Sequence, residues 1–429
     1  MRKIVKKILR FLAKATLNRY RPIIIGITGS VGKTTAKESI FAVLNSRFST
    51  RRNEKNFNNE IGVPLTILGI SLDGGWASKF ANLAQALWLA FGLKLAKYPE
   101  ILVLEMGADK PGDIKYLTDF VRPNIGVVTA IGEVPVHVEF YASPQKVAKE
   151  KSNLIKVLGS ETAVAQLRGR AIPSLAVLNY DDETVLEMKE LCRVRYTTFG
   201  MNQGADFWAS DVAYFTLDDN ETIGGLSFKI NSAENFVPCR IGNLVGVHQL
   251  YGVLAGAAVG RHFGMNLVEI SKALEGIEVP AGRLTLCRGI KNSMVIDDAY
   301  NASPVSTHAA MDVLKNFAEA ESKLQNRTVR RIAVLGDMKE LGKYEIEAHQ
   351  AIGNLAGERT DVLVTVGAAA KFIADSAANQ MKPDTIFSFS TSEEAKIKVK
   401  ELIQEGDVIL VKGSHSMQME KVVEEIVKF

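Results

Sequence analysis

The sequence has 429 residues, of which 47% are hydrophobic and 23% are charged, a balance typical of a folded protein with two or three domains. The formal net charge is only +4, so no overall positive field indicates nucleic acid as the main partner. The three cysteines are widely separated without metal-ligand spacing, and no stretch reaches the roughly 18 to 20 apolar residues that a membrane-spanning helix needs.

Residues 1–21 carry the pattern of a basic amphipathic helix. Apolar residues recur at helical spacing from Val5 to Ala15, with lysines and arginines around them, and no acidic residue occurs before Glu38. Two roles stay open, because one amphipathic face serves both. The helix either docks on the protein's own surface or contacts an anionic membrane face as a peripheral anchor.

The next segments predict a strand–loop–helix order. An apolar strand covers residues 22–29, and further apolar strands follow at 100–107, 125–132 and 175–182. Strands that alternate with helices predict a mainly parallel sheet, with ligand groups at the carboxyl ends of the strands. Residues 194–242 alternate instead in short polar and apolar stretches, which predict an antiparallel β insert.

The segment from 76 to 99 is long and apolar for a connection, with Trp76, Trp88 and Phe91 in it. It predicts a helical hairpin, an interface or a membrane-facing patch. Further along, the chain changes domain near Pro280, because an α/β rhythm restarts after it and runs for about 150 residues, the usual size of one more domain.

The run GITGSVGKTT at 26–35 follows a predicted strand and opens a predicted helix, the context of a phosphate-binding loop. Gly29 and Gly32 let the backbone turn its N–H groups inward, and the helix N-terminus adds a positive dipole. Lys33 neutralises phosphate charge, and the Thr34 hydroxyl can ligate Mg²⁺. Strict Walker A spacing would put glycine at position 27, where this chain has Ile27.

Glu105 ends the apolar strand ILVLE, and a carboxylate there can hold Mg²⁺ on the phosphates of a nucleotide. An acidic residue after a strand is as often a helix cap, so this prediction depends on the phosphate loop upstream. Two further stretches, NFNNEIGVP at 56–64 and residues 133–155, hold asparagines, a histidine and lysines whose role the residues alone leave open.

Taken in order, these stretches resemble one family. The chain is similar to the Mur ligases, the ATP-dependent amide-bond ligases of peptidoglycan precursor assembly, over residues 22–429. The resemblance rests on GITGSVGKTT, NFNNEIGVPLTIL, LEMGADKPGDI, HVEF with AKEKSNLI, LNYDD, GVHQ, AGR, DDAYNASPVS, LGDMKELG and VKGSHSMQME. DDAYNASP and LGDMKELG look most like the members that add D-alanyl-D-alanine.

The resemblance implies an α/β fold with two large domains. A P-loop central ATP-binding domain with a mainly parallel sheet and an antiparallel β insert would cover 22–279. A C-terminal Rossmann-like α/β domain would cover 280–429, and the basic amphipathic helix 1–21 would precede both. The implied reaction phosphorylates a carboxylate with ATP to an acyl phosphate, which an amine then attacks to form the amide, with release of ADP and phosphate.

The resemblance also assigns residues. ATP would contact Gly29, Ser30, Val31, Gly32, Lys33, Thr34, Thr35, Gln249, Arg283 and Asp298. One Mg²⁺ would lie at Thr34 and Glu105, and a second at His137 and Lys151, with Lys151 carbamylated so that it offers an anionic oxygen. Lys33, Lys151 and His137 would be catalytic, and Asn58, Asn59, Asn301 and Asp337 would face the substrates. Gln249 departs from the family, which usually has asparagine after this histidine.

A second departure concerns the start of the chain. Few residues precede the first predicted strand, whereas members that use UDP-linked muramyl peptides ordinarily carry a separate N-terminal domain for the UDP-sugar. We therefore expect that domain to be absent. Either the basic helix and residues 76–99 replace it, or the carboxylate substrate is delivered differently, for example on a lipid carrier.

The favoured function is addition of D-alanyl-D-alanine to a UDP-N-acetylmuramoyl tripeptide, in peptidoglycan synthesis and hence cell-wall growth and division. We expect a cytoplasmic monomer with no nucleic-acid partner. The alternative keeps the ligase chemistry on another carboxylate substrate, as in poly-γ-glutamate, folyl-polyglutamate or lipid-linked precursor enzymes. A nucleotide switch without ligation is disfavoured, since it would not need a second metal site.

Overall fold

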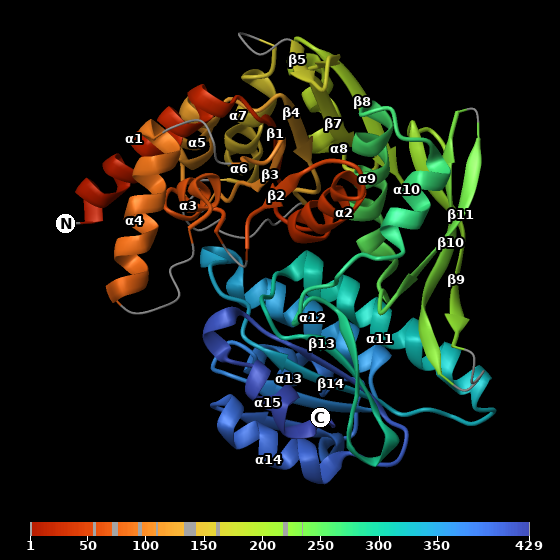
Figure 1. Cartoon of the computed structure of the whole chain (residues 1–429). Helices are drawn as coiled ribbons and strands as arrows, with labels where there is room; N and C mark the ends of the chain where they lie inside the picture. Colours follow the sequence, from red (N-terminus) through yellow and green to blue (C-terminus); the bar gives the residue numbers. More distant parts are fainter. Residues whose placement is uncertain are drawn as a thin grey trace.

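The protein is described by a computed structural model that covers residues 2–54, 57–70, 76–92, 97–108, 110–132, 143–159, 164–217, 222–233 and 235–428. The chain forms two α/β bodies, one built around residues 23–274 and one around residues 285–426 (Figure 1). Helix α1 (Arg2–Tyr20) lies at the outer edge of the first body, where the sequence predicts a basic amphipathic helix.

Within the described residues, nine strands of the first body form one sheet in the order β11-β10-β9-β8-β7-β4-β1-β3-β2. Their bounds are β1 Ile23–Thr28, β2 Thr50–Arg52, β3 Ile101–Glu105, β4 Ile125–Val128, β7 Leu175–Asn179, β8 Arg195–Gly200, β9 Phe207–Thr216, β10 Ile223–Ser232 and β11 Phe236–Gly242. Strands β2, β3, β1, β4, β7 and β8 pair in parallel, which confirms the predicted mainly parallel sheet. A separate hairpin pairs β5 (Val164–Leu167) with β6 (Arg170–Pro173).

The predicted antiparallel insert is right for part of its range and wrong for the rest. Strands β9, β10 and β11 pair antiparallel, but β8 continues the parallel sheet beside β7. The alternating pattern misled the prediction because β8 is buried only toward its carboxyl end, so its sequence reads as half-exposed. The antiparallel strands also extend the same sheet instead of forming a separate layer.

Helices cover both faces of this sheet. Successive side chains of β1 point to opposite faces, so Ile25 and Ile27 pack with one helix layer and Ile24 with the other. The first layer contains α2 (Lys33–Asn45), α9 (Leu250–His262) and α10 (Leu267–Leu274). The opposite side carries α1, α3 (Gly62–Leu68), α5 (Asp113–Val121), α6 (Pro144–Lys151), α7 (Asn153–Lys156) and α8 (Glu183–Leu186).

The second body is a smaller α/β unit. Its described strands form a six-stranded sheet in the order β12-β13-β17-β14-β15-β16, parallel except for β12. The strands are β12 Thr285–Arg288, β13 Met294–Asp298, β14 Arg331–Gly336, β15 Val362–Val366, β16 Ile386–Phe389 and β17 Val408–Lys412. One face is covered by α11 (Pro304–Leu324), α12 (Glu345–Arg359) and α13 (Lys371–Ala377), and the other by α14 (Ser392–Leu402) and α15 (Glu420–Ile426).

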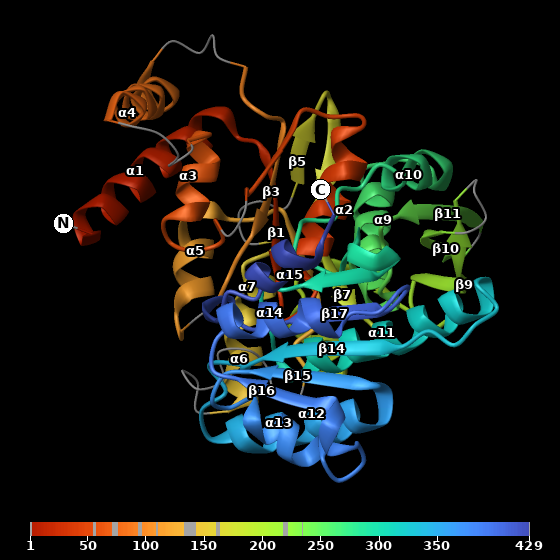
Figure 2. The same cartoon turned by 90° about the horizontal axis from the view of Figure 1, so that it is seen from below.

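Helix α4 (Trp76–Phe91) pairs with α1 on the outside of the first body, and both views show the two helices side by side, away from the second sheet (Figures 1 and 2). Leu12 of α1 and Ala86 and Ala90 of α4 share a small core with α3. For the segment 76–99 the structure shows one helix over 76–91 and no second helix in its other described residues, 92 and 97–99. Residues 93–96 lie outside the described part, and the interface and the membrane-facing patch stay predictions.

The phosphate-loop helix α2 is held in place by close packing on α9. Three glycines at four-residue spacing, Gly252, Gly256 and Gly260, face α2 from α9. A Cβ added to Gly256 would lie 2.8 Å from Ser39 Cβ, closer than side chains can pack. This close approach of two backbones fixes the helix whose first turn meets the phosphate loop.

We expect Gly256→Leu to lower the free energy of unfolding by about 1–3 kcal/mol, because the added carbons would force α2 and α9 apart. Urea denaturation of the full chain measures the change. The matched control is Gly242→Leu, since that position is exposed on β11 and the nearest atom to an added Cβ is 3.9 Å away. Equal losses in both variants would contradict the packing role of Gly256.

Candidate active site

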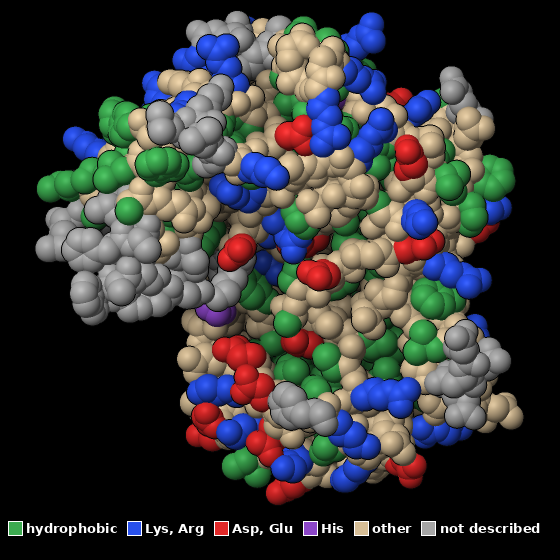
Figure 3. All heavy atoms as spheres, in the orientation of Figure 1, with side chains coloured by type: hydrophobic (Ala, Val, Ile, Leu, Met, Phe, Trp, Pro, Cys, Tyr) green, Lys and Arg blue, Asp and Glu red, His purple; other side chains and the backbone are tan. Residues whose placement is uncertain are grey.

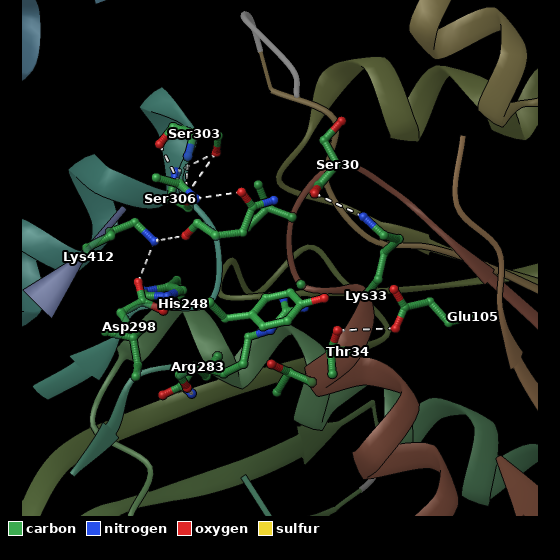
Figure 4. A pocket seen from close by; sticks show the side chains of 18 of the residues that line it. Ser30, Lys33, Thr34, Glu105, His248, Arg283, Asp298, Ser303, Ser306 and Lys412 are labelled. Carbon is green, nitrogen blue, oxygen red and sulfur yellow. Dashed lines mark hydrogen bonds and ion pairs between the residues drawn. The ribbon is translucent and has the colours of Figure 1, made fainter. Parts of the chain in front are cut away.

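The two sheets open onto one shared cleft of about 340 Å³. In an open parallel sheet, ligand groups gather at the carboxyl ends of the strands, and here β1, β3, β13 and β17 all end at this cleft. The lining residues are Ser30, Val31, Gly32, Lys33, Thr34, Thr35, Asn58, Asn59, Glu105, His248, Gln249, Arg283, Leu284, Asp298, Tyr300, Asn301, Ala302, Ser303, Ser306 and Lys412. Figure 4 shows side chains from the two bodies on opposite sides of the cleft.

The loop between β1 and α2 is shaped as a phosphate cradle. Gly32 has φ 82°, in the left-handed region that favours glycine, and it caps the N-terminus of α2. Gly29 lies so close to Thr129 that an added Cβ would be 1.9 Å from its hydroxyl. The Lys33 ammonium donates to the carbonyl oxygens of Gly29 (2.9 Å) and Ser30 (3.1 Å), so it lies over the loop. Backbone N–H groups at a helix N-terminus together with this lysine favour a polyanion.

Ser30 gives a further indication of a ligand in this loop. Its hydroxyl is buried and finds no hydrogen-bond partner among the described residues. A buried hydroxyl without a partner costs free energy, so such groups are ordinarily satisfied by protein, water or a bound ligand. A phosphate oxygen in the cradle would supply the missing acceptor, which fits the assignment of this loop to a nucleotide.

The carboxylate of Glu105 lies beside the loop, at the end of β3. It accepts hydrogen bonds from the Thr34 hydroxyl (3.2 Å) and from the Asn58 amide (3.1 Å). Burial would raise the pKa of this carboxyl, but the nearby Lys33, Lys37 and Arg283 cations and the Asn58 hydrogen bond lower it below its usual value. Glu105 is therefore ionised at neutral pH although it is only 4% exposed.

The oxygens of Thr34 and Glu105 suit a magnesium ion. Mg²⁺ prefers hard oxygen ligands such as a carboxylate and a hydroxyl, and it usually binds through one or two such groups together with substrate phosphates. No set of three or more His, Cys, Asp or Glu in the described ranges forms a metal cluster, so these residues make only part of a coordination shell. When bound, the ion would neutralise charge on the phosphates.

Asn53 is a site residue that the sequence prediction missed. Its side chain pairs with the backbone of Glu105, accepting from the N–H (2.6 Å) and donating to the carbonyl (3.3 Å). Its own carbonyl accepts from the buried Lys37 ammonium at 3.0 Å. The network fixes the strand end that carries the carboxylate. It joins residues more than fifty positions apart, so no local pattern in the sequence reveals it.

Lys151 reaches the same loop from the end of α6. Its ammonium donates to Gly29 O at 2.9 Å and its side chain is 3% exposed, whereas Lys149 of the same helix is exposed. The structure therefore brings Lys151, and not Lys149, to the phosphate cradle. His137, predicted as its metal partner, lies outside the described residues.

The second body contributes its own charges across the cleft. The Lys412 ammonium at the end of β17 donates to the Asp298 carboxylate (2.5 Å) and to Asn301 O (2.9 Å). Arg283 lies with its guanidinium 4.1 Å from the centre of the Tyr300 ring. Arg283 and Asp298, predicted to hold the nucleotide, thus face the phosphate loop, and Lys412 is now placed as the partner of Asp298.

The GVHQ stretch links the two bodies. Gln249 accepts from Gly246 N (3.0 Å) and donates to Arg283 O (3.1 Å), so both ends of its amide are engaged with backbone. The nucleotide contact predicted for Gln249 stays a prediction; what the structure shows is the contact that bridges the two bodies.

His248 also lines the cleft. Burial and the Lys412 charge lower the pKa of its ring to about 4, so the ring is neutral at pH 7.

The predicted substrate residues divide into two groups. Asn58, Asn59 and Asn301 line the cleft, and Asn59 also accepts from the N–H groups of Ile61 and Gly62 at the start of α3. Asp337 does not line the cleft. Its carboxylate is 1% exposed and accepts from the Ala370 N–H and the Lys339 ammonium, both at 2.7 Å.

Ser303 and Ser306 at the start of α11 were not predicted. The Ser303 side chain accepts a hydrogen bond from Ser306 N and so caps the helix. Both serines line the cleft, so the N-terminus of this helix opens on it (Figure 4). The sequence does carry this signal, because serine before proline and a long apolar-periodic run is a helix start. Together with Arg283, the helix end makes this part of the wall attractive to anions, whereas the Lys412 charge is balanced by Asp298.

Comparisons with known proteins match both bodies of the chain to one family. The model of the Mur ligase middle domain matches residues 27–260, and that of the Mur ligase glutamate ligase domain matches 282–415. A UDP-N-acetylmuramoyl-tripeptide–D-alanyl-D-alanine ligase of Bacillus subtilis is 30% identical over 423 residues, 98% of this chain and 79% of the relative.

Two solved structures share the fold. MurF from Acinetobacter baumannii superposes with a TM-score of 0.76 at 24% identity, over 98% of this chain and 80% of that one. The MurF ligase of Thermotoga maritima in complex with ADP also gives 0.76 at 24% identity, over 98% of this chain and 83% of that one. The predicted fold class, two α/β units with mainly parallel sheets, is thereby confirmed.

We expect Glu105→Gln to weaken binding of ADP in the presence of Mg²⁺ by on the order of 10- to 100-fold, the size of effect that lost metal-site partners give. Glutamine keeps the shape and one acceptor oxygen, so mainly the charge is lost. Calorimetry measures the affinity for ADP once with Mg²⁺ and once with a chelator. Only the gain in affinity that Mg²⁺ gives should change in the variant.

The control for this variant is Glu100→Gln, just before the same strand, where the carboxylate pairs with exposed Arg168. That variant should bind ADP as the parent does. Unchanged Mg²⁺-dependent affinity in Glu105→Gln would rule out the carboxylate as a ligand.

Proposed function

Because the chain belongs to the Mur ligase family, we propose that it is the ATP-dependent ligase that adds D-alanyl-D-alanine to a UDP-N-acetylmuramoyl tripeptide. Residues 22–279 would act as the ATP-binding domain and 280–429 as its C-terminal partner. The observation that carries the proposal is the cleft itself. The phosphate loop with Lys33, Thr34 and Glu105 faces Arg283 and the charged end of the second sheet across one cavity.

The reaction needs activation of a carboxylate. A free carboxylate is a poor electrophile, because its negative charge and resonance resist attack by an amine. Transfer of the γ-phosphoryl group of ATP to a carboxylate oxygen gives an acyl phosphate and ADP. The dipeptide amine then attacks the carbonyl carbon, loses a proton, and expels phosphate from the tetrahedral intermediate to leave the amide.

Positively charged groups of the chain lie where they can stabilise the negative charge on the transferred phosphoryl group. The N-terminus of α2 and the Lys33 ammonium hold the ATP phosphates. Arg283 brings a fixed positive charge from the opposite wall. Mg²⁺ at Thr34 and Glu105 would supply further charge neutralisation. Closure of the two bodies around the cleft would keep water away from the acyl phosphate.

We also propose that Lys151 acts as a carbamate. Its neutral amine would attack carbon dioxide and lose one proton, which replaces an ammonium with an anionic oxygen donor suited to a second Mg²⁺ near His137. The placement of Lys151 at Gly29 of the phosphate loop supports this proposal. Asn58, Asn59 and Asn301 would contact the carboxylate and amine substrates in the cleft, and Asp337 would support the loop that follows it.

The proposed setting follows from the substrates. The enzyme would work as a monomer in the cytoplasm, where ATP is supplied, and residues 1–20 would contact the inner face of the membrane. No helix within the described ranges is both long and apolar enough to cross a bilayer.

The decisive assay combines the full chain with ATP, Mg²⁺, D-alanyl-D-alanine and UDP-N-acetylmuramoyl tripeptide. We expect phosphate release that requires both substrates, because the acyl phosphate forms only on the tripeptide and turns over only with the amine. Product mass identifies the new amide. Phosphate release that does not depend on the dipeptide would contradict the proposal. Release that requires glutamate or a lipid-linked substrate instead would point to the alternative carboxylate substrates.

We expect Lys151→Ala to lose ligase activity and added bicarbonate not to restore it, since no amine remains to form the carbamate. Lys151→Arg should fail as well, because a guanidinium keeps the positive charge. Binding of ADP distinguishes loss of the carbamate from damage to the phosphate loop. Both Lys151 variants should still bind ADP as the parent does. Lys149→Ala is the control on the same helix, and full activity in Lys151→Ala would disprove the second-metal role.

A further inference from the structure

Exposed apolar side chains gather on the outer faces of α1 and α4. Among the described residues, Ile4 is 63% exposed, Phe11 62%, Trp88 49% and Phe91 60%. Ile8 and Leu87 belong to the same set. The rings of Phe11 and Phe91 lie 6.1 Å apart, so the two helices share one continuous surface, the α1–α4 surface. Hydrophobic and basic side chains alternate over α1 in the space-filling view (Figure 3).

This surface differs from the other exposed apolar residues. Outside α1 and α4 the large exposed side chains form smaller groups: Phe236 of β11 and Val268 of α10 line one pocket, and Ile397 stands on α14. On α1 the exposed residues Ile4, Ile8 and Phe11 recur at helical spacing, while Leu12 and its neighbours on the opposite side fill the core shared with α3. The helix is therefore docked by one face and leaves a second apolar face uncovered.

The charged side chains that α1 and α4 themselves carry are all basic. No aspartate or glutamate occurs in residues 1–37 or 74–99. Lys6 and Arg10 turn toward the protein, where Lys6 pairs with Glu60 and Arg10 lies 4.5 Å from the centre of the Tyr116 ring. Lys7 and Lys14 are exposed beside the apolar stripe. An apolar strip with lysines along it matches the interface of an anionic bilayer, where acyl chains lie beneath negative headgroups.

We propose that the α1–α4 surface docks the protein on the anionic face of a lipid bilayer, with Phe11, Trp88 and Phe91 at the level of the headgroups. This deepens the membrane contact proposed above for residues 1–20, adds α4 to it, and does not depend on the ligase reaction. Aromatic side chains favour that interfacial level. A second copy of the chain fits less well, since a two-fold contact through this surface would set Lys7 and Lys14 against their own positive charges.

The position of the surface connects it to the cleft. Lys6 pairs with Glu60, and the preceding residue, Asn59, lines the cleft and holds the start of α3. Docking by α1 and α4 would thus place Glu60 and Asn59 behind the docked helix layer, on the side of α1 that faces the protein.

The test measures binding of the full chain to vesicles of phosphatidylcholine alone and of phosphatidylcholine with phosphatidylglycerol, by co-sedimentation. We expect binding only to the anionic vesicles, and weaker binding at high salt. Each lysine near such a surface contributes about 5-fold in affinity, so Lys7→Glu with Lys14→Glu should weaken binding by ~20-fold or more. The charge-matched control is Lys323→Glu with Lys371→Glu, at exposed positions of the second body.

The apolar contribution has its own variants and readout. Phe11→Ser with Phe91→Ser should weaken binding, whereas Val268→Ser with Ile397→Ser, at equally exposed positions elsewhere, should not. All of these side chains are exposed, so urea denaturation midpoints should stay near that of the parent. Brominated phosphatidylglycerol should quench tryptophan fluorescence, and Trp88→Phe should remove much of that quenching.

Two results would overturn the proposal. One is vesicle binding that the Lys7→Glu and Lys14→Glu changes leave intact. The other is a parent chain that does not bind anionic vesicles but forms dimers, if the Phe11→Ser and Phe91→Ser changes together dissociate those dimers. Ligase activity without vesicles should be the same in the parent and in these variants, so a failed vesicle result would not bear on the proposed reaction.

Discussion

Burial of the Glu105 charge is the constraint on which the site depends. A buried carboxylate is costly unless cations and hydrogen-bond donors surround it. Here Lys33 and Lys37 come from α2, Arg283 comes from the second body, and Asn53 holds the strand end. The phosphate loop, the strand end and the facing domain are thus tied to one negative charge. Its depressed pKa keeps that charge over the whole neutral range, as a Mg²⁺ ligand must.

The same electrostatics explains why the site is divided between two bodies. Each sheet ends in charged groups at the cleft. The first body supplies the phosphate cradle with Lys33, and the second body supplies Arg283 on the opposite wall. Gln249 of the first body bridges to Arg283 O, and Asp298 holds Lys412, so the facing wall is ordered by one contact from the first body and one of its own. A ligand that contacts both walls would gain binding free energy when the two bodies close around it. The same closure would exclude water from a reactive acyl phosphate.

The outer layer of the first body carries the surface that we propose to contact a membrane. Helix α1 fills part of the core with Leu12 and leaves its other face uncovered, so the two roles that the sequence left open for this helix are not exclusive. The Lys6–Glu60 pair links this layer to α3, whose first turn adjoins the cleft. The chemistry and the proposed membrane contact therefore share one structural element.

The sequence by itself determined the parallel sheets, the phosphate loop with Lys33 and Thr34, and the acidic strand end at Glu105, because each depends on local periodicity or on a short motif. The family resemblance already selected Lys151, and the tertiary structure added its contact with Gly29 of the loop. Only the tertiary structure decided that Asn53 braces Glu105 and that Asp337 does not line the cleft. It also placed β8 in the parallel sheet. These outcomes depend on contacts between residues far apart in the chain, and no local pattern encodes such distances.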